Sequence, residues 1–136
     1  MSESDQSGKR TGGCNCGRVR FEVGGEPVRV GLCHCQVCRE ETGSLGNLFA
    51  VWRSDQVPTT GETRSFKLSA DNRHFCPTCG SPVFDLVDGV DEIEIRVGAL
   101  DDAPSGLVPL YKLWVKRRER WLAPVAGAEQ HEGNRS

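Results

Sequence analysis

The sequence contains no long apolar run. None of its segments approaches the roughly 20 apolar residues that a helix needs to cross a bilayer. The opening segment 1–13 is polar, whereas a secretion signal has a charged start followed by an apolar stretch. We therefore expect neither membrane insertion nor export, and the expected compartment is the cytoplasm. Disulfides are rare in that reducing compartment, where clustered cysteines more often bind metal or carry out redox chemistry.

Concentrated positive charge is also missing. The 136 residues include 17 Lys and Arg against 19 Asp and Glu, which gives a formal net charge of −2. A surface that binds nucleic acid needs an excess of positive charge to neutralise phosphates. The one basic run, residues 116–120, is short and contains Glu119. We expect a small molecule or a protein as the partner, and neither nucleic acid nor a membrane.

The motifs of the common hydrolases and nucleotide-binding proteins are absent as well. The sequence has no evident Ser-His-Asp arrangement and no glycine-rich loop of the kind that binds phosphates. Its length suits one domain with a hydrophobic core and is too short for two domains of ordinary size. We therefore expect a single domain that uses neither a hydrolase triad nor a nucleotide site.

The hydrophobic pattern indicates an all-β fold. Apolar and polar residues alternate over 18–23 and again over 92–97, and a period of two is typical of half-buried strands. Further strands are expected in four short runs rich in β-branched and aromatic residues, at 28–32, 48–52, 82–86 and 110–115. The one good helical candidate is 36–42, which allows one or two turns and stops at Gly43.

Both ends of the chain are polar. Residues 1–11 are rich in Ser, Asp, Gln, Gly and Lys, and residues 123–136 are equally polar after the last aromatic side chain. Segments of this composition cannot bury much apolar surface. We expect disordered tails at 1–11 and 123–136, with one folded domain over 12–122.

Seven cysteines fall into three tight groups, and this clustering is the chief signal in the sequence. The groups are Cys14-Asn15-Cys16, Cys33-His34-Cys35-Gln36-Val37-Cys38 and Cys76-Pro77-Thr78-Cys79. In an extended strand, residues i and i+2 project from the same face, so each pair with one residue between can aim at one point. In the third group, Pro77 favours a turn and Gly80 permits the close-packed backbone of a zinc knuckle.

The cysteines divide naturally into one centre of four thiolates and one of three. Four thiolates surround zinc completely and make a structural site, whereas three leave one position for water or a substrate. The sequence does not fix which groups combine, but Cys33, Cys35 and Cys38 are close enough in the chain to surround one ion. That leaves four for the closed centre: Cys14, Cys16, Cys76 and Cys79. The alternatives to zinc are a redox dithiol at 76–79 and iron–sulfur ligation.

The histidines are not expected to complete the open centre. His34 lies between two ligand cysteines and should point to the opposite face of the strand. His74 directly precedes the knuckle and is expected at the surface or behind the ligands. His131 lies in the expected tail.

Several basic residues can bind the carboxylates of a small substrate, because a guanidinium group binds a carboxylate through two parallel hydrogen bonds. They are Arg39, Arg73, Lys116, Arg117, Arg118 and Arg120. The alternative, which we favour, is a solvated charged face. The tryptophans, Trp52, Trp114 and Trp121, are expected in the core or in a pocket wall, and Asp101 and Asp102 are expected to shape a turn.

Four motifs occur in a specific order and spacing: Gly13-Cys14-Asn15-Cys16-Gly17, Cys33-His34-Cys35 with Cys38-Arg39, Thr42-Gly43-Ser44, and Phe75-Cys76-Pro77-Thr78-Cys79-Gly80-Ser81-Pro82. Together they resemble the glutathione-dependent formaldehyde-activating enzyme and centromere protein V family. The resemblance continues through residues 97–102 and 114–121, so it covers roughly 12–122. One departure is Lys112, which stands where many relatives carry a histidine.

The resemblance implies a Mss4-like all-β fold with two zinc ions. A structural zinc is implied at Cys14, Cys16, Cys76 and Cys79, and a second, catalytic one at Cys33, Cys35 and Cys38. For some members it implies carbon–sulfur chemistry that joins glutathione to formaldehyde and gives S-hydroxymethylglutathione. The expected function is therefore a zinc-dependent carbon–sulfur lyase or synthase. The alternative is a non-catalytic zinc module that binds a thiol metabolite or a protein partner.

Overall fold

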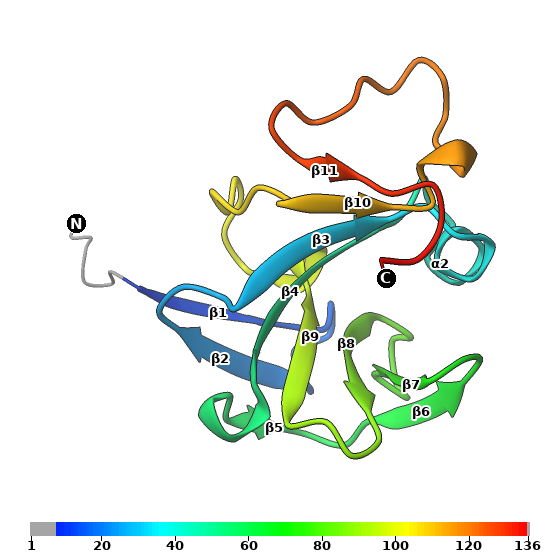
Figure 1. Cartoon of the computed structure of the whole chain (residues 1–136). Coiled ribbons are helices and arrows are strands. Elements are labelled where there is room, and N and C mark those ends of the chain that lie inside the picture. The colour runs from blue at the N-terminus through cyan, green and yellow to red at the C-terminus, as the bar shows by residue number, and fades with distance from the viewer. Residues whose placement is uncertain (1–7, 136) are drawn as a thin grey trace.

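The computed structural model describes residues 8–135, which form two β-sheets and one short α-helix (Figure 1). The smaller sheet is antiparallel, and its order β1-β2-β5 comprises β1 (Lys9–Gly13), β2 (Arg20–Gly24) and β5 (Thr59–Thr60). The larger sheet has eight strands in the order β11-β10-β3-β4-β9-β8-β7-β6.

The strands of the larger sheet, in spatial order, are β11 (Glu129–Gln130), β10 (Tyr111–Leu113), β3 (Arg29–Cys33), β4 (Asn47–Arg53), β9 (Glu92–Arg96), β8 (Pro82–Val87), β7 (Asp71–Phe75) and β6 (Arg64–Lys67). β10 pairs in parallel with both β3 and β11, and the other neighbours pair antiparallel. The parallel pairing brings the end of β10 beside Cys33, because Leu113 lies opposite this residue.

The helix α2 (Gln36–Thr42) connects β3 to β4, and three 3₁₀ turns follow strands: η1 (Ser54–Gln56), η2 (Val97–Ala99) and η3 (Val115–Arg117). α2 ends at Gly43, whose φ of 65° is left-handed and whose N–H donates to the carbonyl of Arg39. A glycine adopts this conformation without the steric cost that a Cβ imposes. No helix in the described range is long and apolar enough to cross a membrane.

The main hydrophobic core lies between the two sheets. The smaller sheet contributes Phe21, and the larger sheet contributes Trp52 and Ile95 among other buried residues. Phe49 and Val51 alternate with these side chains on β4 and belong to a second core on the other face. Strand β4 is therefore buried on both faces, which explains its nearly continuous apolar sequence.

The structure confirms the predicted all-β class, and α2 coincides with the predicted helix 36–42. The predicted boundaries of the two polar tails need correction. Residues 9–11, placed in a tail by sequence, pair with β2 as part of β1, and Glu129–Gln130 of the predicted C-terminal tail pair with β10 as β11. Both short segments are polar and gain order from backbone pairing, which hydrophobicity does not reveal. The predicted tail at residues 1–7 lies outside the described residues.

Gly13 is required by a close backbone approach directly before the first cysteine group. A Cβ at this position would lie 2.0 Å from the carbonyl oxygen of Val19, which accepts a hydrogen bond from the N–H of Cys14. We expect Gly13→Ala to lower the free energy of unfolding by about 1–3 kcal/mol, the usual cost of overpacking. Urea unfolding of the protein measures this change.

Gly98→Ala is the matched control. A Cβ there would meet no atom within 4 Å, and the backbone of Gly98 is not in the left-handed region. We expect its effect on the free energy of unfolding to stay within about 0.5 kcal/mol. An equal decrease in the free energy of unfolding in the two variants would show that the close backbone approach at Gly13 does not affect stability.

Candidate metal centres

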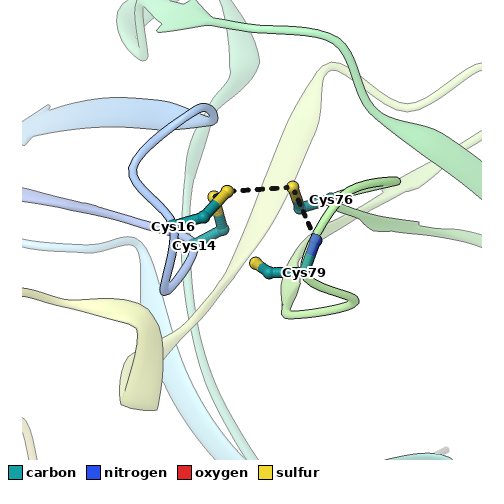
Figure 2. A group of neighbouring side chains, drawn as sticks. All are labelled: Cys14, Cys16, Cys76 and Cys79. Atoms are coloured by element: carbon teal, nitrogen blue, oxygen red, sulfur yellow. Dashed lines mark hydrogen bonds between the residues drawn. The ribbon is translucent and has the colours of Figure 1, made fainter.

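Four cysteine sulfur atoms lie close together where the smaller sheet meets the larger one (Figure 2). Cys14 and Cys16 follow β1, and Cys76 and Cys79 lie in the turn between β7 and β8. All four sulfur atoms lie within 4.8 Å of one another. The Sγ atoms of Cys14 and Cys16 are 3.6 Å apart, and those of Cys16 and Cys76, which are separated by 60 residues in sequence, are 3.7 Å apart.

These distances fit a tetrahedral zinc ion. With Zn–S bonds of about 2.3 Å, neighbouring sulfur atoms of the tetrahedron lie about 3.8 Å apart. A disulfide would bring two sulfur atoms to about 2.05 Å, and no disulfide joins the cysteines of the described chain. The four-thiol group can therefore hold zinc, and it would leave no ligand position open.

Backbone N–H groups shape both turns of the four-thiol group. In the first turn, the N–H of Gly17 donates to the carbonyl of Cys14 at 3.1 Å, and the N–H of Val19 donates to Cys14 Sγ at 3.2 Å. In the second turn, the N–H of Gly80 donates to the carbonyl of Cys76 at 2.8 Å. Two further amides of this turn donate to Cys76 Sγ at 3.4 and 3.5 Å. Donors of this kind favour the thiolate form that zinc binds.

Crowding makes the ionisation of these thiols interdependent. The hydroxyl and backbone of Ser81 are the main causes that lower the pKa of Cys79 to about 5. The pKa of Cys16 rises to about 11 despite an amide hydrogen bond from Arg18, because desolvation and the other three thiols oppose further negative charge. A divalent cation among the sulfur atoms removes this conflict, since each thiolate then faces positive charge.

The second group of thiols lies where β3 passes into α2. Cys33 is the last residue of β3, Cys35 caps the N-terminus of α2, and Cys38 lies in its first turn. The N–H of Cys38 donates to Cys35 Sγ at 3.3 Å. The three sulfur atoms lie within 4.8 Å of one another, and within residues 8–135 no fourth His, Cys, Asp or Glu ligand joins this group. A zinc ion held here would keep one open position.

The three-thiol group is more buried than exposed. Cys33 and Cys38 are buried, and Cys35 is half-buried. Contact with Cys33 and the guanidinium of Arg73 lower the pKa of Cys38 to about 6. The pKa of Cys33 is raised, chiefly by Cys38 and by burial. One thiolate thus forms readily in the absence of metal, and a cation is needed to stabilise the others.

The histidines lie outside both thiol groups, which agrees with the sequence analysis. The ring of His34 is fully buried, and its Nδ1 lies 2.8 Å from the carbonyl oxygen of Leu45. His74 lies 3.0 Å from the hydroxyl of Thr63 through Nδ1 and stacks on Phe84 at 5.0 Å between ring centroids.

Two hollows are lined by residues of α2 and of the segments next to it. The first has a volume of about 560 Å³ and lies between the two thiol groups, where Asn15, Thr42, Asn47, Ser81 and Arg96 are among its lining residues. Asn47 lies opposite Cys33 in the sheet, and Thr42 donates to the carbonyl of Cys38 at 2.7 Å. The first hollow therefore reaches the backbone neighbours of both buried cysteines.

The second hollow is a basic groove of about 530 Å³ lined by Arg39, Glu40, Ser44, Lys116 and Arg117. Arg39 directly follows Cys38 on α2 and donates to the carbonyl of Arg117 at 2.7 Å. The ammonium of Lys116 lies 5.0 Å from the ring centroid of Trp114, which packs against the second core, to which Cys33 and Cys38 belong. The basic groove thus brings three cations close to α2.

Of the basic residues selected from the sequence, Arg73 lies in a different environment from the one expected. It is buried, and its Nη2 donates to Cys38 Sγ at 3.7 Å. The expectation of a solvated charged face is therefore wrong for Arg73. No sequence signal indicated this contact, because β7 and α2 meet only in the folded chain. Arg118 is half-buried and Arg120 is exposed.

The tryptophans, Asp101 and Lys112, also selected from the sequence, lie in different environments. Trp52 is buried and donates to the carbonyl of Gly24 at 3.1 Å, whereas Trp121 is 72% exposed and lies outside the two cores described here. Asp101 accepts hydrogen bonds from Arg20 and Thr11, so it fastens the loop after η2 to the smaller sheet. Lys112 is fully buried, and its Nζ has no hydrogen-bond partner in the described chain.

The fold and these two groups define a small β protein with one closed and one open cluster of thiols suited to zinc. The family model of the glutathione-dependent formaldehyde-activating enzyme matches residues 9–117. The chain therefore belongs to this family, which confirms the resemblance seen in the sequence.

A solved structure supports the fold. It is a crystal structure of a Rhodobacter sphaeroides protein, a structural-genomics target, which is 23% identical to this chain with a TM-score of 0.57. The match covers 73% of this chain and 97% of that one. No curated protein matches the sequence.

Loss of a single cysteine is expected to have different effects in the two centres. Cys76→Ala should abolish zinc binding between the sheets and unfold the domain, because structural zinc contributes about 10 kcal/mol or more to folding. Cys35→Ala should lose one of two zinc ions and keep the β fold, because its centre lies within one continuous segment. Zinc content by mass spectrometry and far-UV circular dichroism measure both effects.

The stoichiometry decides between the possible outcomes. We expect two zinc ions per wild-type chain and one per Cys35→Ala chain. A wild-type chain with one zinc that Cys35→Ala also retains would contradict an open second centre.

Proposed function

We propose that this protein is a zinc-dependent carbon–sulfur lyase or synthase that acts on a glutathione–aldehyde adduct of the S-hydroxymethylglutathione type. The proposed centre consists of Cys33, Cys35 and Cys38. The observation that carries the proposal is the three-thiol group with no fourth protein ligand among residues 8–135. A hollow of about 560 Å³, whose lining includes Asn47, the strand partner of Cys33, supports it. The four-thiol group is proposed to be structural, because it offers zinc a complete set of ligands.

The reaction needs no redox partner. The glutathione sulfur forms a bond to the carbonyl carbon of the aldehyde, and the thiol proton passes to the carbonyl oxygen; cleavage is the reverse. Zinc bound at the open centre would supply a Lewis acid that lowers the pKa of a thiol. The three cysteines would hold that ion, and the rest of the site would orient the substrate. We place this activity in the cytoplasm.

The basic groove is the proposed site for the substrate carboxylates. Glutathione carries two carboxylates, and guanidinium and ammonium groups bind such anions through charge-assisted hydrogen bonds. Arg39 is already held by Glu119 at 2.7 Å, which fixes the direction of its guanidinium. Lys116 and Arg117 line the same groove, and they are exposed. These two side chains are therefore proposed to contact the substrate.

The direct test is the rate at which ¹³C-formaldehyde and glutathione form S-hydroxymethylglutathione, followed by NMR exchange. We expect the wild type to accelerate formation and Cys35→Ala to return it to the uncatalysed rate. We expect the protein to accelerate the reaction of a thiol without carboxylates, such as 2-mercaptoethanol, less than that of glutathione. Glutathione binding without any acceleration would contradict the enzyme and support the non-catalytic module.

Charge removal in the basic groove provides a separate test. We expect replacement of Lys116 and Arg117 together by alanine to weaken glutathione binding about 5- to 10-fold, since exposed charge pairs contribute up to about 1 kcal/mol each. The contribution should shrink as salt is added. Isothermal titration calorimetry measures the dissociation constant.

The matched control removes two positive charges from the exposed strand β6. The double alanine variant of Arg64 and Lys67 changes the net charge equally, and its two residues do not line the basic groove. We expect wild-type affinity in this control. An equal loss in both variants would indicate a general charge effect and would contradict binding in the groove.

A further inference from the structure

A buried arginine touches a sulfur atom of the three-thiol group. Arg73 projects from β7, and its side chain is only 5% exposed. Its Nη2 donates to Cys38 Sγ at 3.7 Å and lies 3.3 Å from a carboxylate oxygen of Asp71. Its Nη1 donates to Glu41 at 2.8 Å. The guanidinium is therefore held on several sides and cannot turn away from Cys38 without losing these contacts.

Glu41 ties this arginine to the helix that carries Cys38. Glu41 lies one turn after Cys38 on α2, and its side chain is 8% exposed. The same carboxylate oxygen accepts from Arg73 and from Arg96, each at 2.8 Å. Arg96 in turn pairs with Asp85, whose side chain is 1% exposed. Strands β7, β8 and β9 thus fix the position of α2 through buried ion pairs.

The cost of burying these charges indicates a task beyond packing. Charged groups lose hydration when they are buried, and the attraction between them often does not offset this loss. Apolar residues of similar volume therefore often stabilise a core equally well or better. Here Nη2 of Arg73 contacts Cys38 Sγ in addition to the carboxylate of Asp71. Three thiolates around a divalent cation carry a net negative charge, and this charge needs compensation inside the protein. Arg73 is the guanidinium that the structure places in contact with it.

We propose that Arg73 is a positioning residue of the three-thiol centre, which orients Cys38 Sγ by a charge-assisted hydrogen bond and reduces the electron donation of this sulfur to a bound metal ion. This inference rests on the proposed second metal centre. The hydrogen bond lowers the energy of the sulfur lone pairs. The sulfur atom therefore donates less strongly to a metal ion. The bound ion then remains a better acceptor for an anionic thiol, which three strong donors alone would disfavour.

Cobalt reports on this contact without any assay of activity. The full-length protein, loaded with one equivalent of zinc, would receive Co²⁺ as the second equivalent, and its sulfur-to-cobalt charge-transfer band would be recorded. Cys35→Ala must lose this band if it arises from the three-thiol centre. In Arg73→Met we expect the band to move to lower energy, because Cys38 Sγ then donates more strongly. We expect the second metal to bind about 10- to 100-fold more weakly, because Cys38 Sγ is no longer held in position.

Two further variants separate positioning from stability. Arg96→Met breaks the same buried network at a residue that makes no sulfur contact, so we expect this variant to unfold more easily and to keep the band in place. Arg73→Lys keeps a positive charge near Cys38 and should give intermediate band energy and affinity. Chemical unfolding of each variant shows that the domain remains folded under the conditions of the titration.

The outcomes distinguish this inference from the proposed function. A wild-type band with the same energy and affinity in Arg73→Met would overturn the role of Arg73 and leave the open centre intact. An equal shift in Arg96→Met would also overturn it, since general loosening would then explain both. A wild type that takes up no second metal would overturn the proposed function and this inference together.

Discussion

Four sulfur atoms from two turns far apart in the sequence converge on one point between the two sheets. Cys14 and Cys16 come from the edge of the smaller sheet, and Cys76 and Cys79 come from the β7–β8 turn of the larger one. Four thiols in this space repel one another as they ionise, and a divalent cation converts that repulsion into attraction. Structural zinc contributes about as much free energy as an entire small domain retains on folding. The main core between the sheets can then remain modest.

The three-thiol group depends on local geometry and on buried charge. The end of β3 and the start of α2 bring Cys33, Cys35 and Cys38 together within six residues, so this group does not have to hold distant strands. Its surroundings come from far along the chain: Leu113 of β10 pairs beside Cys33, and Arg73 of β7 touches Cys38. We propose that the four-thiol group stabilises the fold and that the three-thiol group serves binding and chemistry.

The sequence predicted the features that depend on neighbouring residues. The helix 36–42 with its stop at Gly43 coincides with α2, and the alternation over 92–97 matches the buried Ile93 and Ile95 of β9. The grouping of the cysteines followed from their spacing and from the direction in which strand side chains project. The resemblance to a known family extended this grouping to specific zinc ligands, which stay a prediction here.

Features that depend on long-range pairing could not be predicted in this way. The polar strands β1 and β11 are ordered by hydrogen bonds to β2 and β10, which no local pattern reveals. Arg73 was expected on a solvated charged face, yet it is buried and its Nη2 contacts Cys38 Sγ, 35 residues earlier in the chain. Charged residues are rarely buried without partners, so sequence reasoning assigns them to the surface by default.

Anomalous diffraction at the zinc absorption edge would locate both proposed zinc ions, in crystals grown without small thiols and then soaked with glutathione. We expect one peak among Cys14, Cys16, Cys76 and Cys79, unchanged by glutathione. We expect a second peak among Cys33, Cys35 and Cys38, with a fourth ligand that is not protein and that the glutathione sulfur replaces. A single peak, or a second zinc whose fourth ligand is a protein side chain that glutathione does not displace, would contradict these expectations.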